Sequence, residues 1–313
     1  MTSTISRIGI HTSVSELFPP AVLRDTLAEI GPTVRIVEAE ESLTECDALV
    51  TFGYEESFLS ADLTWIHSIQ AGVDRFPFDE LADRGVALTS SAGIHGDSVG
   101  ETVAGYMLMF ARGLHTQRTN QMRQEWAYPA WDSAFTLHGE SLCVIGLGTL
   151  GRGIAMRADA LGMDVTGVKR TPTPVDHVET VYSPTDLHEA IAEVRFVALA
   201  VPLTEQTTGL IAEPELHALR DDAYLINVAR GGVVDQSALV AALESETLAG
   251  AALDVFETEP LPEESPLWEM DDVIVSSHAA AANREYYRRV AALVRENLRR
   301  IEADESLAND VVG

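Results

Sequence analysis

Residues 142–168 read LCVIGLGTLGRGIAMRADALGMDVTGV, and this stretch decides the fold. An apolar strand over 142–145 runs into the glycine-rich segment 146–151, followed by a predicted helix over 152–161 and a second strand over 164–168. Strand, GxGxxG and helix in this order form a dinucleotide fingerprint, because the glycines allow a tight turn, close approach of a pyrophosphate and close helix–strand packing. The pyrophosphate would lie at the helix N-terminus. We therefore predict that the cofactor is bound by Gly146, Gly148, Thr149, Leu150 and Gly151.

The end of the second strand carries an unusual residue for such a site. An Asp or Glu there normally accepts the ribose hydroxyls of NAD. Eighteen residues past Gly151 (169 − 151) stands Lys169, the only lysine of the chain, followed by Arg170 and Thr171. Two adjacent cations suit a 2′-phosphate, so we predict that these residues bind NADP(H) in preference to NAD(H), which stays possible. The alternative is a pair of solvated cations at a strand end.

The charge of the chain indicates its setting. There are 21 basic and 49 acidic residues, giving a formal net charge of −28, and the acidic residues are spread along the whole chain. Such a surface repels itself unless the Debye length is short. With lysine nearly absent and arginine retained, this predicts a halophilic source and a salt-rich cytoplasm. An acidic protein that binds basic partners is the alternative, but no acidic block supports it. Nucleic acid is an improbable ligand.

Cysteine usage and hydropathy predict a soluble, unexported protein. Cys46 and Cys143 lie far apart, and Cys143 sits in an apolar strand, so buried thiols are expected rather than a disulfide. The N-terminus lacks a basic region followed by an apolar core, and no apolar run approaches 18 residues. We expect a cytoplasmic protein that has no membrane contact and binds no metal.

A length of 313 residues predicts about two domains. Short apolar strands alternate with helical stretches from the start, which implies a parallel sheet. The first series of predicted strands covers 7–10, 34–37, 48–52, 65–69 and 86–89. The second, beyond the glycine-rich unit, covers 196–200, 223–228, 250–254 and 273–276, and a final helix runs from about Asn283 through Arg300.

A long helix separates the two series. The segment Ser98 to Glu101 reads as a capping box that opens this helix. Its apolar face is predicted to hold Val99, Val103, Tyr106, Met107, Phe110 and Leu114, and an aromatic arm with Trp126, Tyr128 and Trp131 follows. We predict an α/β protein with two Rossmann-like or flavodoxin-like parallel-sheet domains and a cleft between them. The substrate domain would comprise residues 1–98 plus 285–313, and the dinucleotide-binding domain residues 99–284.

Three later strands end in polar residues able to do chemistry. Arg230 follows the strand over 223–228, Glu257 and Glu259 follow 250–254, and His278 follows 273–276. Ligands of open α/β sheets gather beyond the carboxyl ends of the strands. Each residue alone is weak evidence, since such a histidine is more often packed or solvated, and the arginine and glutamates are often turn or loop residues.

Together, in this order after a dinucleotide motif, these segments resemble the D-isomer-specific 2-hydroxyacid dehydrogenases over most of the chain. Asn227 to Asp235 (NVARGGVVD) looks like the arginine motif of that family, and Asp254 to Pro262 (DVFETEPLP) looks like its glutamate motif. The segment Val201-Pro202-Leu203-Thr204, with Thr208 and Gly209, is similar to its cofactor-contacting loop. Gln70 to Asp74 (QAGVD) resembles the loop whose amides hold the substrate carboxylate.

The resemblance and the chemistry of the groups predict a mechanism. Hydride transfer to a 2-keto acid leaves negative charge on the carbonyl oxygen, which then needs a proton. His278 would donate it, and Glu259 on the other ring nitrogen would fix the tautomer and favour the protonated ring. Arg230 would grip the carboxylate and polarise the carbonyl. The backbone at Ala71, Gly72 and Val73 would hold the same carboxylate from the other domain.

The resemblance also implies further cofactor contacts and an assembly. Asp254 would meet the nicotinamide carboxamide, with Ala229 near the same ring. The remaining contacts would come from Val201, Pro202, Thr208, Val228 and Ala280. A homodimer through the cofactor domain is implied, using the long helix and the aromatic arm. D stereochemistry of the product comes from the resemblance alone.

The chain departs from the family at two kinds of position. Ser277 and Ala280 stand where the family usually has Pro before the histidine and Gly after it, and both are small enough to keep the histidine accessible. Lys169 replaces the acidic ribose ligand, which puts NAD preference in doubt. A glyoxylate or hydroxypyruvate reductase of narrow specificity is the nearest alternative, and a dinucleotide-binding corepressor scaffold is a remote one. A formate dehydrogenase would pair the histidine with glutamine rather than Glu259.

Overall fold

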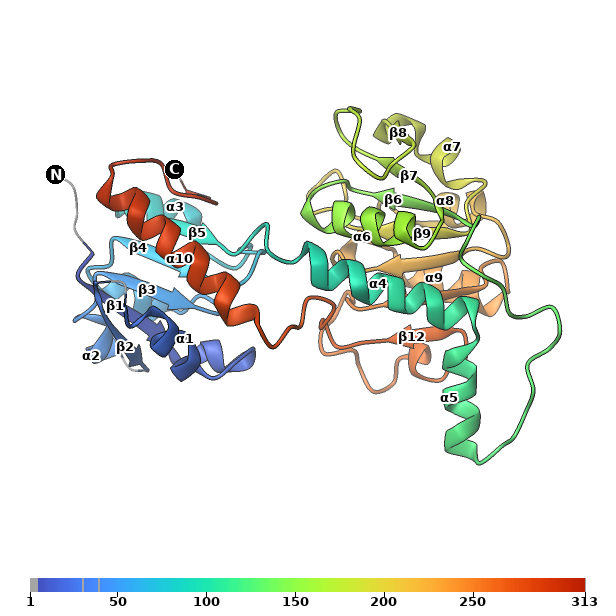
Figure 1. Ribbon diagram of the computed structural model, residues 1–313, viewed down its shortest axis with the longest axis horizontal. Helices are drawn as coiled ribbons and strands as arrows, with labels where there is room; N and C mark the ends of the chain where they lie inside the picture. The colour runs from blue at the N-terminus through green and yellow to red at the C-terminus, as the bar shows by residue number, and fades with distance from the viewer. Residues whose placement is uncertain (1–4, 30, 39, 313) are drawn as a thin grey trace. The chain divides into compact units, whose positions relative to one another are not determined.

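The computed structural model describes residues 5–29, 31–38 and 40–312, which form two α/β units (Figure 1). Unit 1 comprises residues 1–94 and 282–313, and unit 2 comprises residues 95–281. These divisions lie within four residues of the expected domain limits (98 − 94 = 4 and 284 − 281 = 3). Each unit contains one sheet whose strands are all parallel, as the alternation of strands and helices predicts.

The sheet of unit 1 has the strand order β2-β1-β3-β4-β5, which is the flavodoxin-like order. Its strands are β1 Arg7–His11, β2 Thr33–Val37, β3 Ala48–Thr51, β4 Trp65–Ser68 and β5 Ala87–Ser90. Its helices are α1 Pro20–Leu27, α2 Glu40–Leu43, α3 Phe78–Asp83 and α10 Tyr286–Glu302, with 3-10 turns at Thr12–Glu16 and Glu56–Ser60. The chain thus returns to unit 1 at its end, where α10 buries Tyr286, Val290 and Val294 in the core that β1 and β4 share.

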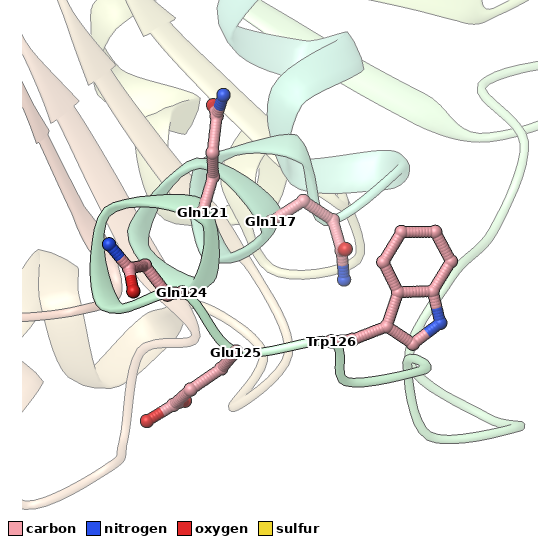
Figure 2. Close-up of a pocket in the computed structure, with 5 residues that line it drawn as sticks. All are labelled: Gln117, Gln121, Gln124, Glu125 and Trp126. Atoms are coloured by element: carbon pink, nitrogen blue, oxygen red, sulfur yellow. The ribbon is translucent and has the colours of Figure 1, made fainter.

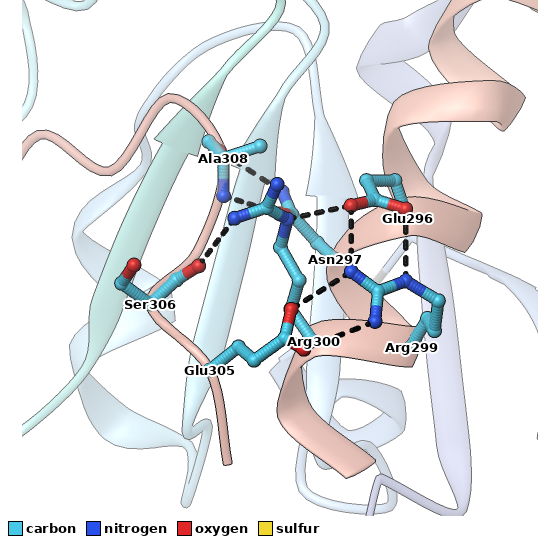
Figure 3. A network of polar contacts seen from close by, with 7 residues as sticks. All are labelled: Glu296, Asn297, Arg299, Arg300, Glu305, Ser306 and Ala308. Atoms are coloured by element: carbon cyan, nitrogen blue, oxygen red, sulfur yellow. Dashed lines mark hydrogen bonds and ion pairs between the residues drawn. The ribbon is translucent and has the colours of Figure 1, made fainter. Parts of the chain in front are cut away.

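Polar contacts fix the segment after α10 (Figure 3). The fully buried Asn297 bonds both the amide and the carbonyl of Ala308, at 2.7 and 3.2 Å. Arg299 joins Glu296 to Glu305, and the arginines beside Glu296 lower the pKa of that carboxyl to about 2. The amide of Val311 then donates to the carbonyl of Leu88 at 2.9 Å. The segment over 306–312 is therefore held beside β5.

The sheet of unit 2 has the order β12-β11-β10-β9-β6-β7-β8. Its strands are β6 Ser141–Ile145, β7 Asp164–Val168, β8 Thr180–Tyr182, β9 Phe196–Leu199, β10 Tyr224–Asn227, β11 Gly250–Leu253 and β12 Val273–Val275. Its helices are α4 Gly96–Ala111, α5 Leu114–Arg123, α6 Thr149–Ala160, α7 Leu187–Ile191, α8 Glu213–Ala218 and α9 Gln236–Glu244. Three 3-10 turns cover Pro184–Asp186, Gly231–Val233 and Pro266–Trp268. The strand order reverses between β6 and β9, which is the position where such sheets bind ligands.

Both faces of this sheet are covered by apolar side chains, as a parallel sheet requires. Successive residues of β6 point to opposite faces, so Cys143 and Ile145 pack in one core while Leu142 and Val144 pack in the other. Burial raises the pKa of the Cys143 thiol to about 12, so this cysteine is an apolar core residue at neutral pH.

The long helix differs from its prediction at both ends. It begins at Gly96, so Ser98 lies inside its first turn and cannot be the N-cap. It ends at Ala111, and Gly113, with φ +59°, separates it from α5, where Leu114 is half exposed. The capping-box and Leu114 predictions were therefore wrong. The other predicted apolar residues of the helix are buried, as expected.

Close packing against α6 explains the early start of α4. A Cβ added at Gly153 would lie 2.0 Å from the carbonyl oxygen of Gly96, and one added at Gly100 would lie 2.3 Å from that of Gly153. Two helices can approach this closely only where the residues in contact lack side chains. Packing of α4 on α6, and not a capping side chain, thus sets the beginning of α4.

The aromatic arm after α5 is exposed. The side chains of Trp126, Tyr128 and Trp131 are fully open to solvent, and the arm extends from unit 2 together with α5 (Figure 1). Along α5 and the start of the arm lies a hollow of about 360 Å³ (Figure 2), lined by Gln117, Gln121, Gln124, Glu125 and Trp126. Within the described residues, no helix is both long and apolar enough to span a membrane.

Candidate active site

The glycine-rich loop joins β6 to α6. Gly146 has φ +99°, and a Cβ there would lie 2.7 Å from the carbonyl oxygen of Ala200, which follows β9. A Cβ at Gly151 would lie 1.9 Å from the carbonyl oxygen of Gly146, whereas Gly148 has open space around it. Helix α6 begins at Thr149, three residues earlier than predicted, so Thr149 and Leu150 belong to its first turn. The first-turn amides of a helix lack intrahelical acceptors and suit an anion.

Lys169 and Arg170 follow β7 next to this loop. The amide of Lys169 donates to the carbonyl of Tyr182 at 3.0 Å, and its Nζ donates to Thr173 Oγ1 at 2.9 Å. Arg170 and Thr171 are exposed. Neither cation forms an ion pair with an acidic side chain of the described residues, so both charges are available to an anion.

The strand order of the sheet reverses between β6 and β9. The glycine-rich loop follows β6 at this position, and a second loop follows β9. Thr207, a residue that sequence reasoning did not single out, organises it by donating to the carbonyl of Pro202 at 2.6 Å and accepting the amide of Thr204 at 2.8 Å. Thr208 donates to the carbonyl of Thr204 at 2.8 Å. Val201 contacts the position of Gly146. The predicted cofactor residues Val201, Pro202 and Thr208 therefore lie in one hydrogen-bonded loop beside the glycine-rich turn.

A buried asparagine shapes the turn that carries Arg230. Asn227, the last residue of β10, accepts the amide of Ala229 at 3.0 Å and donates to the carbonyl of Arg230 at 3.1 Å. Nη1 of Arg230 donates to the carbonyl of Ala229 at 2.7 Å. The turn lies directly against the segment after β11, because a Cβ at Gly231 would lie 1.9 Å from the carbonyl of Phe256. Val228 and Ala229 are themselves buried.

Glu259 and His278 form the central pair of the site. Oε2 of Glu259 lies 2.8 Å from Nδ1 of His278, and Oε1 accepts the amide of Phe256 at 3.1 Å. Because an ionised carboxylate can only accept, Nδ1 carries a proton, which leaves Nε2 as the nitrogen that exchanges protons with other groups. Glu257 bonds instead to the amide of Gln236, at 3.1 Å. The structure thus distinguishes the two glutamates of this segment.

Asp254 holds the backbone around His278. The residue is 1% exposed; its carboxylate accepts the amides of Ala279 and Ala280, each at 2.8 Å, and its carbonyl accepts the amide of His278 at 2.8 Å. His278 has φ +53°, a left-handed conformation that is uncommon for residues other than glycine. Three hydrogen bonds from consecutive amides therefore fix the histidine in a backbone conformation that it would otherwise rarely adopt.

Two further residues extend this arrangement. Ser276 donates to Oδ1 of Asp254 at 2.5 Å, so the hydroxyl of Tyr106, 2.6 Å from Ser276 Oγ, must be the donor in that pair. Neither Ser276 nor Tyr106 was a predicted site residue. Two features of the sequence could have indicated them. The serine stands at the end of an apolar strand, and the tyrosine, whose hydroxyl needs a hydrogen-bond partner, lies on the apolar face of a helix.

The loop predicted to bind the substrate carboxylate, Gln70 to Asp74, lies in unit 1, directly after β4. The amide of Ile69 donates to the carbonyl of Thr51 at 2.8 Å, and the carbonyl of Val73 accepts the amide of Phe76 at 2.9 Å. Val73 is buried and Ala71 exposed. Among the residues that the structure describes, no acceptor is paired with the amides of Ala71 and Gly72. This loop is thus anchored on both sides, with two amides available between the anchors.

The comparisons with known proteins agree with this geometry. The family model for the NAD binding domain of D-isomer specific 2-hydroxyacid dehydrogenases matches residues 104–280, which is 177 of 313 residues (280 − 104 + 1). A glyoxylate reductase from Korarchaeum cryptofilum is 32% identical over 296 residues, covering 91% of this chain and 88% of the relative. The chain belongs to the D-isomer-specific 2-hydroxyacid dehydrogenase family. It is therefore an oxidoreductase with a nicotinamide dinucleotide-binding domain.

Solved structures of this family match both units of the dehydrogenase. A family member from Aeromonas salmonicida subsp. salmonicida has a TM-score of 0.84 at 28% identity, covering 99% of each chain. A family member from Xanthobacter autotrophicus, solved in complex with NADPH and MES, has a TM-score of 0.80 at 31% identity, covering 99% of this chain and 98% of the other. The prediction of two parallel-sheet α/β domains is confirmed.

Proposed function

We propose that this dehydrogenase reduces 2-keto acids to D-2-hydroxy acids, with NADPH as the preferred hydride donor. The Glu259–His278 pair supports the proposal, because a carboxylate bonded to Nδ1 of a histidine is the arrangement that acid/base transfer through Nε2 would use, and the histidine follows β12 in the same sheet as the dinucleotide loop. The residues present fit such a cofactor: Gly148 is open, and the first turn of α6 follows it directly. When bound, the cofactor supplies the hydride.

The protein groups then have distinct tasks. Nε2 of His278 donates a proton to the substrate oxygen, and Glu259 holds the imidazolium through Nδ1. The guanidinium of Arg230 binds the carboxylate and polarises the carbonyl, while the amides at Ala71, Gly72 and Val73 bind the same carboxylate. Asp254 keeps His278 in place, and we propose that it also meets the nicotinamide carboxamide beside Ala229 and Ala280.

Lys169 and Arg170 support the preference for NADPH. Both lie after β7, where NAD-specific sites carry an acidic residue, and no acidic side chain of the described residues neutralises either cation. A 2′-phosphate would supply the missing negative charge, with Thr171 as a further contact. The relative from Xanthobacter autotrophicus was solved with NADPH. NADH stays a possible second donor.

Glyoxylate reduction of narrow specificity is the second candidate, favoured by the name of the relative from Korarchaeum cryptofilum. The deciding experiment offers NADPH with glyoxylate, hydroxypyruvate, pyruvate and branched 2-keto acids in molar potassium chloride, and resolves the chiral products by chromatography. We expect 2-hydroxy acids equal in amount to the NADPH oxidised, and the D isomer wherever the product is chiral. Turnover of glyoxylate alone would favour the narrow reductase, and L products or no product from folded protein would contradict the proposal.

We also propose a homodimer that buries the aromatic arm. Exposed large apolar side chains gather on α5 and the arm, at Leu114, Met122, Trp126, Tyr128 and Trp131. Such a concentration of exposed apolar surface is typical of protein interfaces. Light scattering should give twice the mass of one chain for the wild type and one chain's mass for a Trp126→Ser, Trp131→Ser variant. A monomeric wild type would exclude this assembly.

A salt-rich cytoplasm is our proposal for the setting of the enzyme. The net charge of −28 favours high salt, and both Cys46 and Cys143 are free thiols, as in a reducing compartment. Titration of two thiols in unfolded protein isolated from its source would support that compartment. A disulfide between chains would contradict it.

A further inference from the structure

A buried series of hydrogen-bonded polar groups crosses the core of unit 1 beneath the loop over residues 70–74. Trp65 and His67 lie on the same face of β4, and Thr89 and Ser91 lie at the end of β5. Nε1 of Trp65 donates to Thr89 Oγ1 at 2.8 Å, and Nδ1 of His67 lies 2.9 Å from the same oxygen. Nε2 of His67 lies 3.1 Å from Ser91 Oγ. Burying polar groups so completely costs free energy unless they are hydrogen-bonded, and here each group is bonded to the next.

The Trp65 end of this hydrogen-bonded series leaves the Thr89 proton available to His67. Burial lowers the pKa of His67 to about 3, so its ring is neutral and carries one proton. An indole N–H can only donate, so Thr89 accepts from Trp65 and its own proton is available to Nδ1 of His67. If Thr89 donates to Nδ1, the ring proton lies on Nε2 and is donated to Ser91, which is the arrangement that the Tyr286 end requires.

The other end of this hydrogen-bonded series reaches the loop over residues 70–74, which is predicted to bind the substrate carboxylate. The hydroxyl of Tyr286, the first residue of α10, donates to the carbonyl of Ile69 and also contacts the Ser91 hydroxyl. Burial raises the pKa of Tyr286, so it remains a donor at neutral pH. Since its proton goes to Ile69, its oxygen accepts from Ser91. Ser91 has no second proton, so it accepts from Nε2 of His67, and Nδ1 accepts from Thr89. The direction is continuous, and the groups donate in the order Trp65, Thr89, His67, Ser91, Tyr286, each to the next and the last to Ile69.

A second contact ties the same backbone to β5. The amide of Ser91 donates to the carbonyl of Gln70 at 2.9 Å. Two consecutive carbonyls, those of Ile69 and Gln70, are therefore bound immediately before Ala71. The carbonyl of Ile69 shares a peptide plane with the amide of Gln70, and the carbonyl of Gln70 shares one with the amide of Ala71. The two contacts therefore fix two successive peptide planes and set the direction of the Ala71 amide, the first of the loop.

We propose that Tyr286, with His67 and Ser91 behind it, is a positioning residue that fixes the backbone entering the 71–73 loop and so helps to direct the loop amides at the substrate carboxylate. This inference rests on the proposed function, in which that loop binds the carboxylate. Tyr286 touches neither substrate nor cofactor; it acts through the carbonyl of Ile69. Its contribution is therefore expected in substrate binding, and not in binding of the dinucleotide by unit 2.

Adjacent tyrosines provide a matched test. Tyr286→Phe removes the donor to Ile69, whereas Tyr287→Phe removes a hydroxyl that accepts only from Arg288 among the described contacts. We expect Tyr286→Phe to raise KM for the 2-keto acid about three- to tenfold, the range for one lost hydrogen bond, with kcat and the Kd for NADPH nearly unchanged. Tyr287→Phe should match the wild type. Ser91→Ala is a second variant and should act in the same direction as Tyr286→Phe.

Hydrogen exchange of a peptide spanning residues 65–76 gives a readout independent of turnover. Faster exchange in Tyr286→Phe than in Tyr287→Phe, together with the KM increase, would support the inference. Equal exchange in both variants would overturn it, and so would a loss spread equally over KM, kcat and NADPH binding, which indicates general destabilisation. Faster exchange in a protein whose wild type reduces no 2-keto acid would instead refute the proposed function and leave the control of the loop by Tyr286 standing.

Discussion

At the scale of single residues, Lys169 is the position where one side chain decides between two cofactors. Lys169→Asp replaces a cation with the carboxylate that accepts ribose hydroxyls in NAD-binding sites. We expect kcat/KM for NADPH to fall about tenfold or more, as for loss of a charge-assisted hydrogen bond, while that for NADH rises. Lys169→Gln removes only the positive charge and should give an intermediate ratio. An unchanged NADPH to NADH ratio in both variants would show that selectivity lies elsewhere.

His67 makes the stability of unit 1 sensitive to acid. Its pKa is about 3 in the folded protein, against about 6.5 in the unfolded chain. Below pH 6.5 the unfolded chain binds a proton that the folded protein does not bind. The stability linked to His67 is therefore present above pH 6.5 and falls with pH, by about 1.4 kcal/mol per pH unit, until the pH nears 3.

A variant isolates this effect from the many carboxylates. The free energies of unfolding of the wild type and of His67→Gln are measured in urea at about pH 7 and about pH 5, in equal salt. Between pH 7 and pH 5, we expect the free energy of unfolding of the wild type to fall by about 2 kcal/mol more than that of His67→Gln. A gap that stays constant would show that His67 does not titrate between these pH values.

At the scale of elements, the contact of α4 with α6 depends on glycine. A Cβ at Gly153 would meet the backbone of Gly96 at 2.0 Å, so Gly153→Ala must separate the helices and should lower the free energy of unfolding by about 1–3 kcal/mol. Gly105, also in α4, has no neighbour within 4 Å of its Cβ position. Gly105→Ala should stabilise by about 0.5–1 kcal/mol, because alanine favours helix. Thermal unfolding of both variants checks the pair, and equal effects would contradict this account of the packing.

Elements were predictable where one local pattern dominates. The alternation of apolar strands with helices predicts both parallel sheets, and GxGxxG predicts the turn between β6 and α6. The beginning of α4 was mispredicted because packing of Gly96 on Gly153, which the local sequence does not reveal, overrides the capping pattern at Ser98. The break at Gly113 was missed because a single glycine is compatible with both a helix and a turn.

The candidate site also contains residues that the sequence predicts and contacts that it does not. Arg230, Glu259 and His278 follow from polar residues at strand ends and from the family resemblance. The hydrogen bonds from Ser276 to Asp254, from Tyr106 to Ser276 and from Tyr286 to Ile69 join residues more than 20 positions apart. Such contacts depend on tertiary packing, so sequence spacing gives no sign of them.

At the scale of the whole molecule, the net charge of −28 should govern stability. Raising ionic strength from about 0.1 M to about 1 M shortens the Debye length from about 10 Å to about 3 Å, which weakens self-repulsion. We expect the unfolding temperature and the activity to rise together over this range of potassium chloride. Sucrose at equal osmolality is the control and should have a smaller effect. A protein equally stable at both salt concentrations would contradict the proposed salt adaptation.

The central claim is that His278 transfers the proton while unit 2 binds the cofactor independently of it. The most direct measurement compares wild type and His278→Gln in molar potassium chloride, following NADPH oxidation by a 2-keto acid and NADPH binding by fluorescence. We predict that His278→Gln loses at least about a hundredfold in kcat and binds NADPH as the wild type does. Turnover near the wild-type rate in His278→Gln would contradict the account.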